Sequence, residues 1–103
     1  YDGTTWTAGA NLNTARYSLG GAGTQTAGLG FGGYAGTANT ASTEEYNGTA
    51  WTTGGSMATT RRSLGGAGTQ TSALGFGGQT TVVVANTEEY SGSTTTLNYR
   101  TLQ

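Results

Sequence analysis

Two pairs of adjacent glutamates, Glu44–Glu45 and Glu88–Glu89, are the side chains of this sequence best suited to chemistry, since paired carboxylates can serve as general acid and base. The spacing argues against that role, because neighbouring residues on a strand point to opposite faces and the two carboxylates of a pair diverge. One glutamate of each pair is expected to bond an arginine or to cap a turn. The residues given this structural role are Glu44, Glu88, Arg16 and Arg61.

The residue types needed for several other kinds of catalysis are absent from the chain. The chain has no histidine and no cysteine, which excludes Ser-His and Cys-His nucleophiles, histidine metal sites and disulfides. Calcium binding by the glutamates and loop carbonyls is the weaker alternative to their structural role. The glycine-rich segment 28–33 has the composition of a phosphate loop but lacks the following helix, the lysine and the spacing of one. We expect no enzyme activity, no metal and no cofactor.

Charge and hydrophobicity limit the classes of partner that the chain is expected to bind. The formal net charge is −1 and the four basic residues are all arginines, so no basic patch is available to neutralise the phosphates of a nucleic acid. No apolar run approaches the roughly 20 residues that span a bilayer. We therefore expect neither a nucleic-acid nor a membrane partner. The chain starts without a methionine or a signal peptide, and we expect a processed product or a fragment.

An internal repeat supplies the elements that would position these residues. Residues 1–33 and 46–78 are identical at 22 of 33 positions, at an offset of 45 residues. A period of this size is typical of stacked units, none of which buries its apolar face alone. The repeats carry few large apolar residues, and so short a chain buries a modest share of its surface. We therefore expect two repeats to need neighbours for stability.

Each repeat is expected to form four short strands, because Thr, Tyr, Val, Phe and Trp favour strands whereas dense glycine disfavours helix by about 1 kcal/mol per residue. This is the size of a propeller blade. A further strand is expected at Thr4–Ala8. The predicted strands are Ser18–Thr24, Leu29–Tyr34, Ser42–Tyr46 and Ala50–Thr53, then Ser63–Thr69, Leu74–Gln79, Val83–Tyr90 and Ser93–Leu97. The single repeat domain, 1–103, divides into an N-terminal strand and loop (1–15), a first blade (16–54), a second blade (61–97) and a tail (98–103).

The pattern resembles the kelch family of propellers. Residues 43–68, followed by Leu-Gly-Phe-Gly-Gly at 74–78, place a Tyr before a turn, a Trp on the fourth strand, an Arg at the start of the next blade and a Gly-Gly pair after the second strand. The strings GGAGTQT and TEEY also resemble kelch-like repeats in structural proteins of tailed phages, marine ones especially. The resemblance covers nearly the whole chain. It implies an all-β propeller with two blades per chain, and the missing histidine and cysteine exclude the copper oxidase activity of some kelch relatives.

Two residue types fit a propeller physically. In the first strand, nearest the axis, the glycines of segment 20–23 let neighbouring backbones approach closely. Trp6 and Trp51 are expected to fill the wedge between blades, each with an indole N–H able to reach a backbone carbonyl. A ligand-stacking role is the alternative for both.

Variation between the repeats indicates where binding would occur. The connection at 34–40 becomes shorter at 79–83, and the connection at 10–17 differs from its counterpart at 55–62. In propellers these connections share one face, and loops on a rigid scaffold commonly bind. Drift in solvated loops is the alternative reading. The candidate contacts are Tyr17, Tyr34, Asn39, Arg62 and Gln79.

The sequence thus predicts a non-enzymatic structural or adhesive module of a virion, such as a tail fibre or decoration, or of another extracellular surface. Expected partners are copies of itself, other virion proteins and cell-surface glycans. Three chains forming six blades is the favoured ring, ahead of four chains, with Thr4–Ala8 completing the second blade of a neighbour. The alternatives are a lectin-like propeller, a kelch protein-interaction adaptor, and a different fold such as a trimeric β-fibre or β-solenoid.

Overall fold

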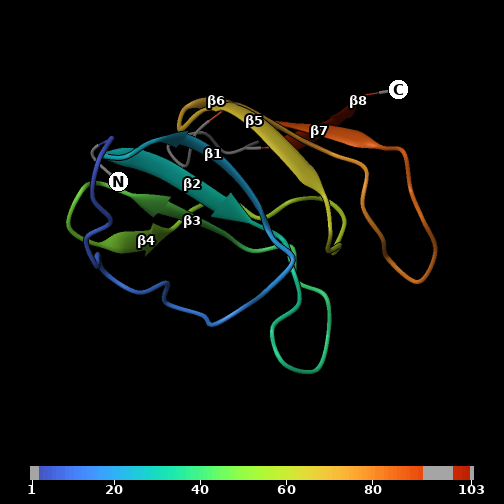
Figure 1. Cartoon of the computed structure of the whole chain (residues 1–103). Coiled ribbons are helices and arrows are strands. Elements are labelled where there is room, and N and C mark those ends of the chain that lie inside the picture. Colours follow the sequence, from blue (N-terminus) through green and yellow to red (C-terminus); the bar gives the residue numbers. More distant parts are fainter. Residues whose placement is uncertain (1–2, 92–98, 103) are drawn as a thin grey trace.

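Two antiparallel sheets, one from each repeat, lie side by side in the computed structural model of the chain (Figure 1). The structure describes residues 3–91 and 99–102. Strands follow one another in sequence order across each sheet, so each strand pairs with the next strand of its own sheet. The first sheet contains β1 (Gly20–Thr24), β2 (Ala27–Phe31), β3 (Thr43–Tyr46) and β4 (Trp51–Thr53), and the second contains β5 (Gly65–Thr69), β6 (Ser72–Phe76), β7 (Thr87–Tyr90) and β8 (Tyr99–Leu102).

The all-β expectation and the two antiparallel sheets are confirmed, and the described residues include no helix able to span a membrane. The strand ends differ from the predicted ones for a backbone reason. Ser18 and Ser63 both have a φ of 56°, which takes them out of the extended ladder, so the first strand of each sheet starts two residues later. Gly33 and Gly78 have φ of 98° and 92°, and the second strand of each sheet ends before them.

The first strands of the two sheets approach each other closely. A Cβ placed on Gly66 of β5 would lie 2.6 Å from the carbonyl oxygen of Gly21 in β1, which leaves no room for a side chain. Backbone hydrogen bonds join the sheets next to this contact: Ser63 N donates to Ser18 O at 2.6 Å, and Gly33 N donates to Arg61 O at 2.8 Å. The glycines of the first strands therefore act as the sequence suggested, by allowing the backbones to meet.

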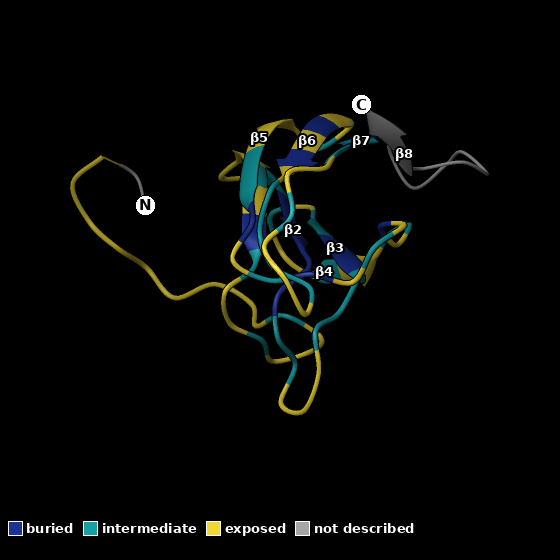
Figure 2. Ribbon diagram, turned by 90° about the vertical axis from the view of Figure 1, so that its right-hand side faces the viewer, coloured by how far each residue is buried: buried dark blue, intermediate teal, exposed yellow. Residues whose placement is uncertain are grey.

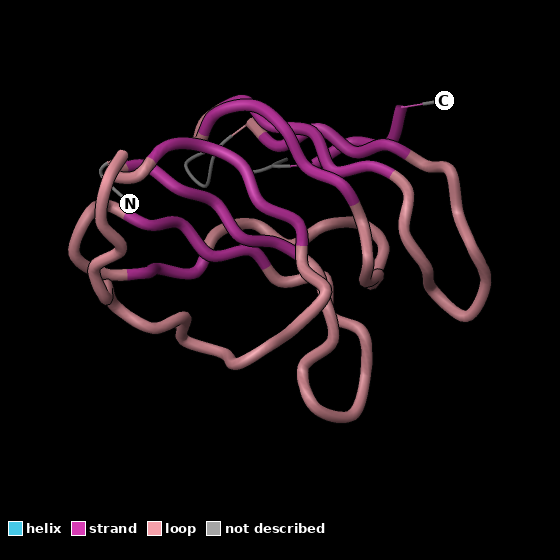
Figure 3. Tube along the Cα trace, in the orientation of Figure 1, coloured by secondary structure: helices cyan, strands magenta, loops and turns pink. Residues whose placement is uncertain are grey.

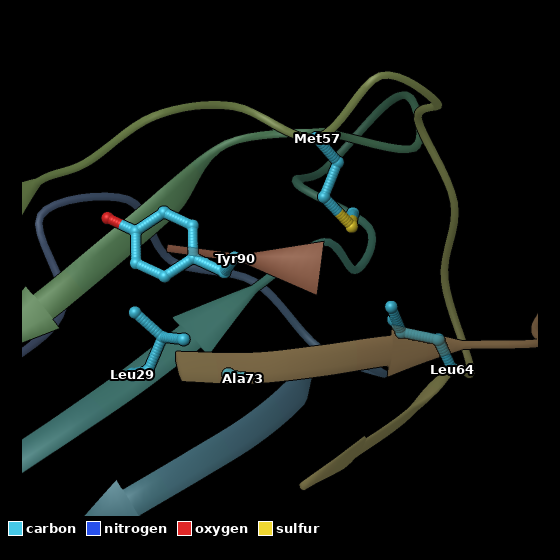
Figure 4. Packing of buried hydrophobic residues seen from close by; sticks show 5 residues of the cluster. All are labelled: Leu29, Met57, Leu64, Ala73 and Tyr90. Carbon is cyan, nitrogen blue, oxygen red and sulfur yellow. The ribbon is translucent and has the colours of Figure 1, made fainter. Parts of the chain in front are cut away.

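The hydrophobic core lies between the two sheets. Leu29 of β2 meets Ala73 of β6 and Tyr90 of β7, with Leu64 and Met57 extending the cluster (Figure 4). Gln70, in the turn before β6, adds polar contacts by donating from Nε2 to the carbonyl oxygens of Gly28 and Tyr46 at 3.1 and 2.7 Å. The second sheet thus covers one face of the first, and its own equivalent face stays uncovered. In Figure 2, buried and exposed residues alternate along β6, as expected for a strand with one covered and one open face.

The two tryptophans do not fill the wedge between the sheets of this chain. Trp51 lies on the outer face of the first sheet, against Tyr46 with ring centroids 4.9 Å apart, and its indole N–H reaches the carbonyl oxygen of Ala10 at 3.1 Å as expected. Trp6 is 82% exposed. Trp51 lies in β4, on a face of the first sheet against which the single chain packs no second sheet, so packing of the tryptophans between blades of different chains stays a prediction.

The ends of the chain also differ from expectation. Residues 4–8 are exposed and form no strand, so the strand expected there is absent from the single chain. The fourth strand of the second sheet is β8, inside the segment predicted as a tail, with Tyr99 opposite Tyr90 in the place that Trp51 holds opposite Tyr46. The strand predicted at Ser93–Leu97 lies outside the described residues. Completion of a neighbour's second blade by Thr4–Ala8 stays a prediction, although β8 holds that edge of β7 here.

Candidate functional site

The five residues selected from the variable connections are brought together by isolated backbone bridges and side-chain contacts. Long connections project from one edge of the sheets (Figure 3). Tyr17 and Tyr34 form the centre of the group, with stacked rings whose centroids are 5.3 Å apart at an interplanar angle of 19°. Their backbones exchange two hydrogen bonds, Tyr17 N to Tyr34 O at 3.1 Å and Tyr34 N to Tyr17 O at 2.8 Å. The bridge fixes both rings side by side on a rigid base.

Arg62 extends this stack from the second repeat. Its guanidinium carbon lies 5.1 Å from the centroid of the Tyr34 ring, which is the geometry of a cation–π contact. Because Arg62 is the counterpart of Tyr17, the same backbone position supplies an aromatic ring in one repeat and a cation in the other. The row Tyr17, Tyr34, Arg62 therefore crosses the boundary between the sheets.

Gln79 and Asn39 complete the group. Arg62 and Gln79 exchange backbone hydrogen bonds at 3.0 and 2.9 Å, repeating the bridge between the two tyrosines. Asn39 reaches across from the first repeat, and its Nδ2 donates to the carbonyl oxygens of Gln79 at 3.3 Å and Thr80 at 3.2 Å. We call Tyr17, Tyr34, Asn39, Arg62 and Gln79 the loop cluster. Tyr17 is its most open member, with 57% of its surface exposed, and the other four are partly buried.

A buried arginine directly precedes each leading residue of the loop cluster. Arg16 NH1 donates to the carbonyl oxygens of Gly32 and Ser42 at 3.1 and 2.8 Å, and its NH2 contacts Glu44 Oε2 at 2.6 Å. These bonds tie the connection before β1 to the end of β2 and the start of β3. Tyr17, the next residue, is thereby placed opposite Tyr34.

The second repeat contains the same arrangement. Arg61 NH1 donates to the carbonyl oxygens of Gly77 and Asn86 at 3.0 and 2.7 Å, and its NH2 contacts Glu88 Oε2 at 2.8 Å. Arg62 follows it as Tyr17 follows Arg16. The sequence indicated that these arginines were structural. The structure adds that they position the loop cluster, a role that depends on carbonyl groups no sequence motif marks.

The glutamates of each adjacent pair separate. Glu44 and Glu88 are buried, 2% and 0% exposed, and each bonds its arginine and backbone N–H groups of the connection before the sheet. Glu45 instead accepts a hydrogen bond from the hydroxyl of Tyr90. The carboxylates of a pair therefore serve different contacts. Across residues 3–91 and 99–102, no group of three or more His, Cys, Asp or Glu side chains is placed to hold a metal ion.

A cavity lies on the outer face of the first sheet, away from the loop cluster. This cavity has a volume of about 510 Å³ and mixes hydroxyl, amide and aromatic groups. Tyr46 and Trp51 form its aromatic wall, and residues 7–10 form the opposite side. We call residues 3–15, which precede β1, the N-terminal arm. The lining residues are Thr7, Ala8, Gly9, Ala10, Thr24, Gln25, Thr26, Gly28, Tyr46, Gly48 and Trp51.

Neither a protein-family model nor a curated protein sequence matches the chain.

Proposed function

We propose that this chain is a non-enzymatic structural or adhesive module with kelch-like blades, part of a virion or of another extracellular surface, which contacts proteins or surface glycans through the loop cluster. The observation that supports this most is the meeting of five variable residues on an otherwise repeated scaffold. The buried arginine, its glutamate and the glycines recur in both repeats, whereas Tyr17 becomes Arg62 and Tyr34 becomes Gln79. A surface that changes while its support is kept is typical of binding loops.

The chemistry of the loop cluster suits contact rather than catalysis. It presents a flat aromatic ring, a guanidinium and two amides, and contains neither a carboxylate nor a hydroxyl activated by a base. The two glutamates that could supply acid and base, Glu44 and Glu88, are buried in ion pairs. The cluster can therefore stack on and hydrogen-bond to a partner without changing it.

Carbohydrate binding is the second candidate, and the tyrosine stack specifically favours it. Tyr17 is 57% exposed and backed by Tyr34, so its ring offers an open apolar face of the kind that packs on the C–H face of a sugar. Arg62 and Asn39 supply donors beside that ring. The lectin-like reading thus uses the same residues as the adhesive one and differs in the partner.

Binding to a panel of immobilised glycans and to candidate virion proteins tests both readings. Tyr17→Ala should abolish the signal while leaving the melting temperature within a few degrees, because the removed ring is mostly exposed. Trp6→Ala is the matched control, since it removes an 82% exposed aromatic side chain that is not part of the loop cluster. A Tyr17→Ala variant that retains full binding to an identified partner would refute the assignment of this surface.

A further inference from the structure

The outer face of the second sheet is the repeat of a face that is fully covered in the first. Leu29 and Phe31 of β2 are 3% and 0% exposed because the second sheet lies on them. Their counterparts Leu74 and Phe76 in β6 are 38% and 41% exposed. The chain thus ends, at this side, in an apolar surface already shown by its own first repeat to fit a further sheet.

The outer face of the first sheet is equivalent, by the repeat, to the face of the second sheet that packs on Leu29 and Phe31. Between the sheets, the Phe31 ring lies over glycines of the second sheet: a Cβ on Gly66 would be 2.7 Å from Phe31 Cζ, and one on Gly75 would be 3.4 Å from its Cε2. Gly21 and Gly30 hold the corresponding positions in the first sheet. Gly21 is exposed, and a Cβ there would meet nothing nearer than Leu29 O at 3.6 Å.

We propose that a second copy of this chain docks on these surfaces head to tail, with its Leu74 and Phe76 face on the Gly21 face of the first copy. The contact between the two sheets of one chain is then repeated between chains. Two hydrogen bonds are expected between the copies. Ser18 N of the first copy would donate to Ser63 O of the second, which repeats the bond from Ser63 N to Ser18 O within one chain. Gly78 N of the second copy would donate to Arg16 O of the first, which repeats the bond from Gly33 N to Arg61 O.

The N-terminal arm contacts the first sheet in the same way that the connection between β4 and β5 contacts the second sheet. Gly9 lies against the Tyr46 hydroxyl in the way that Gly54 lies against the Tyr90 hydroxyl. Asn13 N bonds Glu44 just as Ala58 N bonds Glu88. Such a head-to-tail contact uses two different surfaces, so it continues until a ring closes or a filament forms. Three copies would give the six-bladed ring expected from the sequence.

Association of the full chain can be measured by sedimentation equilibrium over a range of concentrations. Wild type should reach a mass of several chains. Gly21→Ala should raise the concentration of half-association at least about tenfold while leaving the single chain folded, because the added methyl group has room in one chain but would meet Gly66 O of the second copy. Phe76→Asp should have the same effect from the other surface. Val83→Asp, a charge at an 85% exposed apolar residue of a loop, is the matched control and should associate as wild type does.

Mixing the two defective variants separates head-to-tail docking from other contacts. Gly21→Ala keeps an intact second-sheet face and Phe76→Asp keeps an intact first-sheet face, so the mixture should form pairs and stop there. A wild-type chain that stays monomeric at high concentration would overturn the proposal, since the open faces would then belong to a different partner. Undiminished association of Gly21→Ala, or failure of the mixture to pair, would overturn it as well. Glycan or protein binding by the loop cluster is read separately from mass, so the two proposals fail independently.

Discussion

Replacing Arg61 by methionine tests the idea that a buried ion pair supports the loop cluster. The side chain is fully buried, and its guanidinium bonds two carbonyl oxygens and Glu88. Arg61→Met keeps most of the volume but leaves the carboxylate of Glu88 buried without its cation, for which the typical cost is about 3–5 kcal/mol. Urea unfolding should show this as a midpoint lower by about 2–3 M, for an m-value near 1.5 kcal/mol per M.

The adjacent arginine provides the control. Arg62→Met removes a partly exposed cation lying over the Tyr34 ring, which should cost about 0.5–1 kcal/mol. Adding Glu88→Leu to Arg61→Met should recover part of the loss, because a buried pair replaced by apolar groups is far less costly than half a pair, although Ala58 N loses its acceptor. If Arg61→Met were no more destabilised than Arg62→Met, the network would not be the support inferred for the loop cluster.

Three further comparisons use circular dichroism melting and urea midpoints of single variants. Phe31→Ala should lose about 3–5 kcal/mol because the ring is fully buried, whereas Phe76→Ala, 41% exposed in the single chain, should lose only about 1–2 kcal/mol under monomeric conditions; equal losses would contradict the open second face. Gly66→Ala should lose about 1–3 kcal/mol through its contact with Gly21 O, and a variant as stable as wild type would show that the first strands are not in close approach. Trp51→Ala should lose about 1–3 kcal/mol, less than a core tryptophan, because one face of the ring is open; a loss below about 0.5 kcal/mol would argue against its packing on Tyr46.

Much of the loop cluster was accessible from sequence because repeats give an internal comparison. The two copies keep the same turns, but Tyr17 of the first is replaced by Arg62 in the second, and Tyr34 by Gln79. These differences mark positions that the fold does not require to be one residue type. The structure brings those positions together through paired backbone bridges. The link made by Asn39 to the second repeat was not accessible, since it depends on how the two sheets sit against each other.

The surroundings of the tryptophans, in contrast, were not accessible from the sequence. Trp51 has the composition of a core residue, and the sequence could indicate that it packs on a sheet. Which face of a sheet is covered depends on how many sheets are present and on their order. The alternation of apolar and polar residues along one strand determines neither. The pairing of β8 with β7, which places Tyr99 opposite Tyr90, falls in the segment predicted as a tail and was not accessible either.

The sequence by itself determined the repeating unit, its strand composition and the absence of histidine and cysteine, because these follow from local residue type and spacing. Tertiary structure alone decided which glutamate became buried with an arginine, and that Ser18 and Ser63 leave the ladder at a φ of 56°. It also decided that Leu29 and Phe31 are covered while Leu74 and Phe76 are not. Identical strings therefore have different exposures, since burial is a property of the neighbour packed against a strand and not of the strand itself.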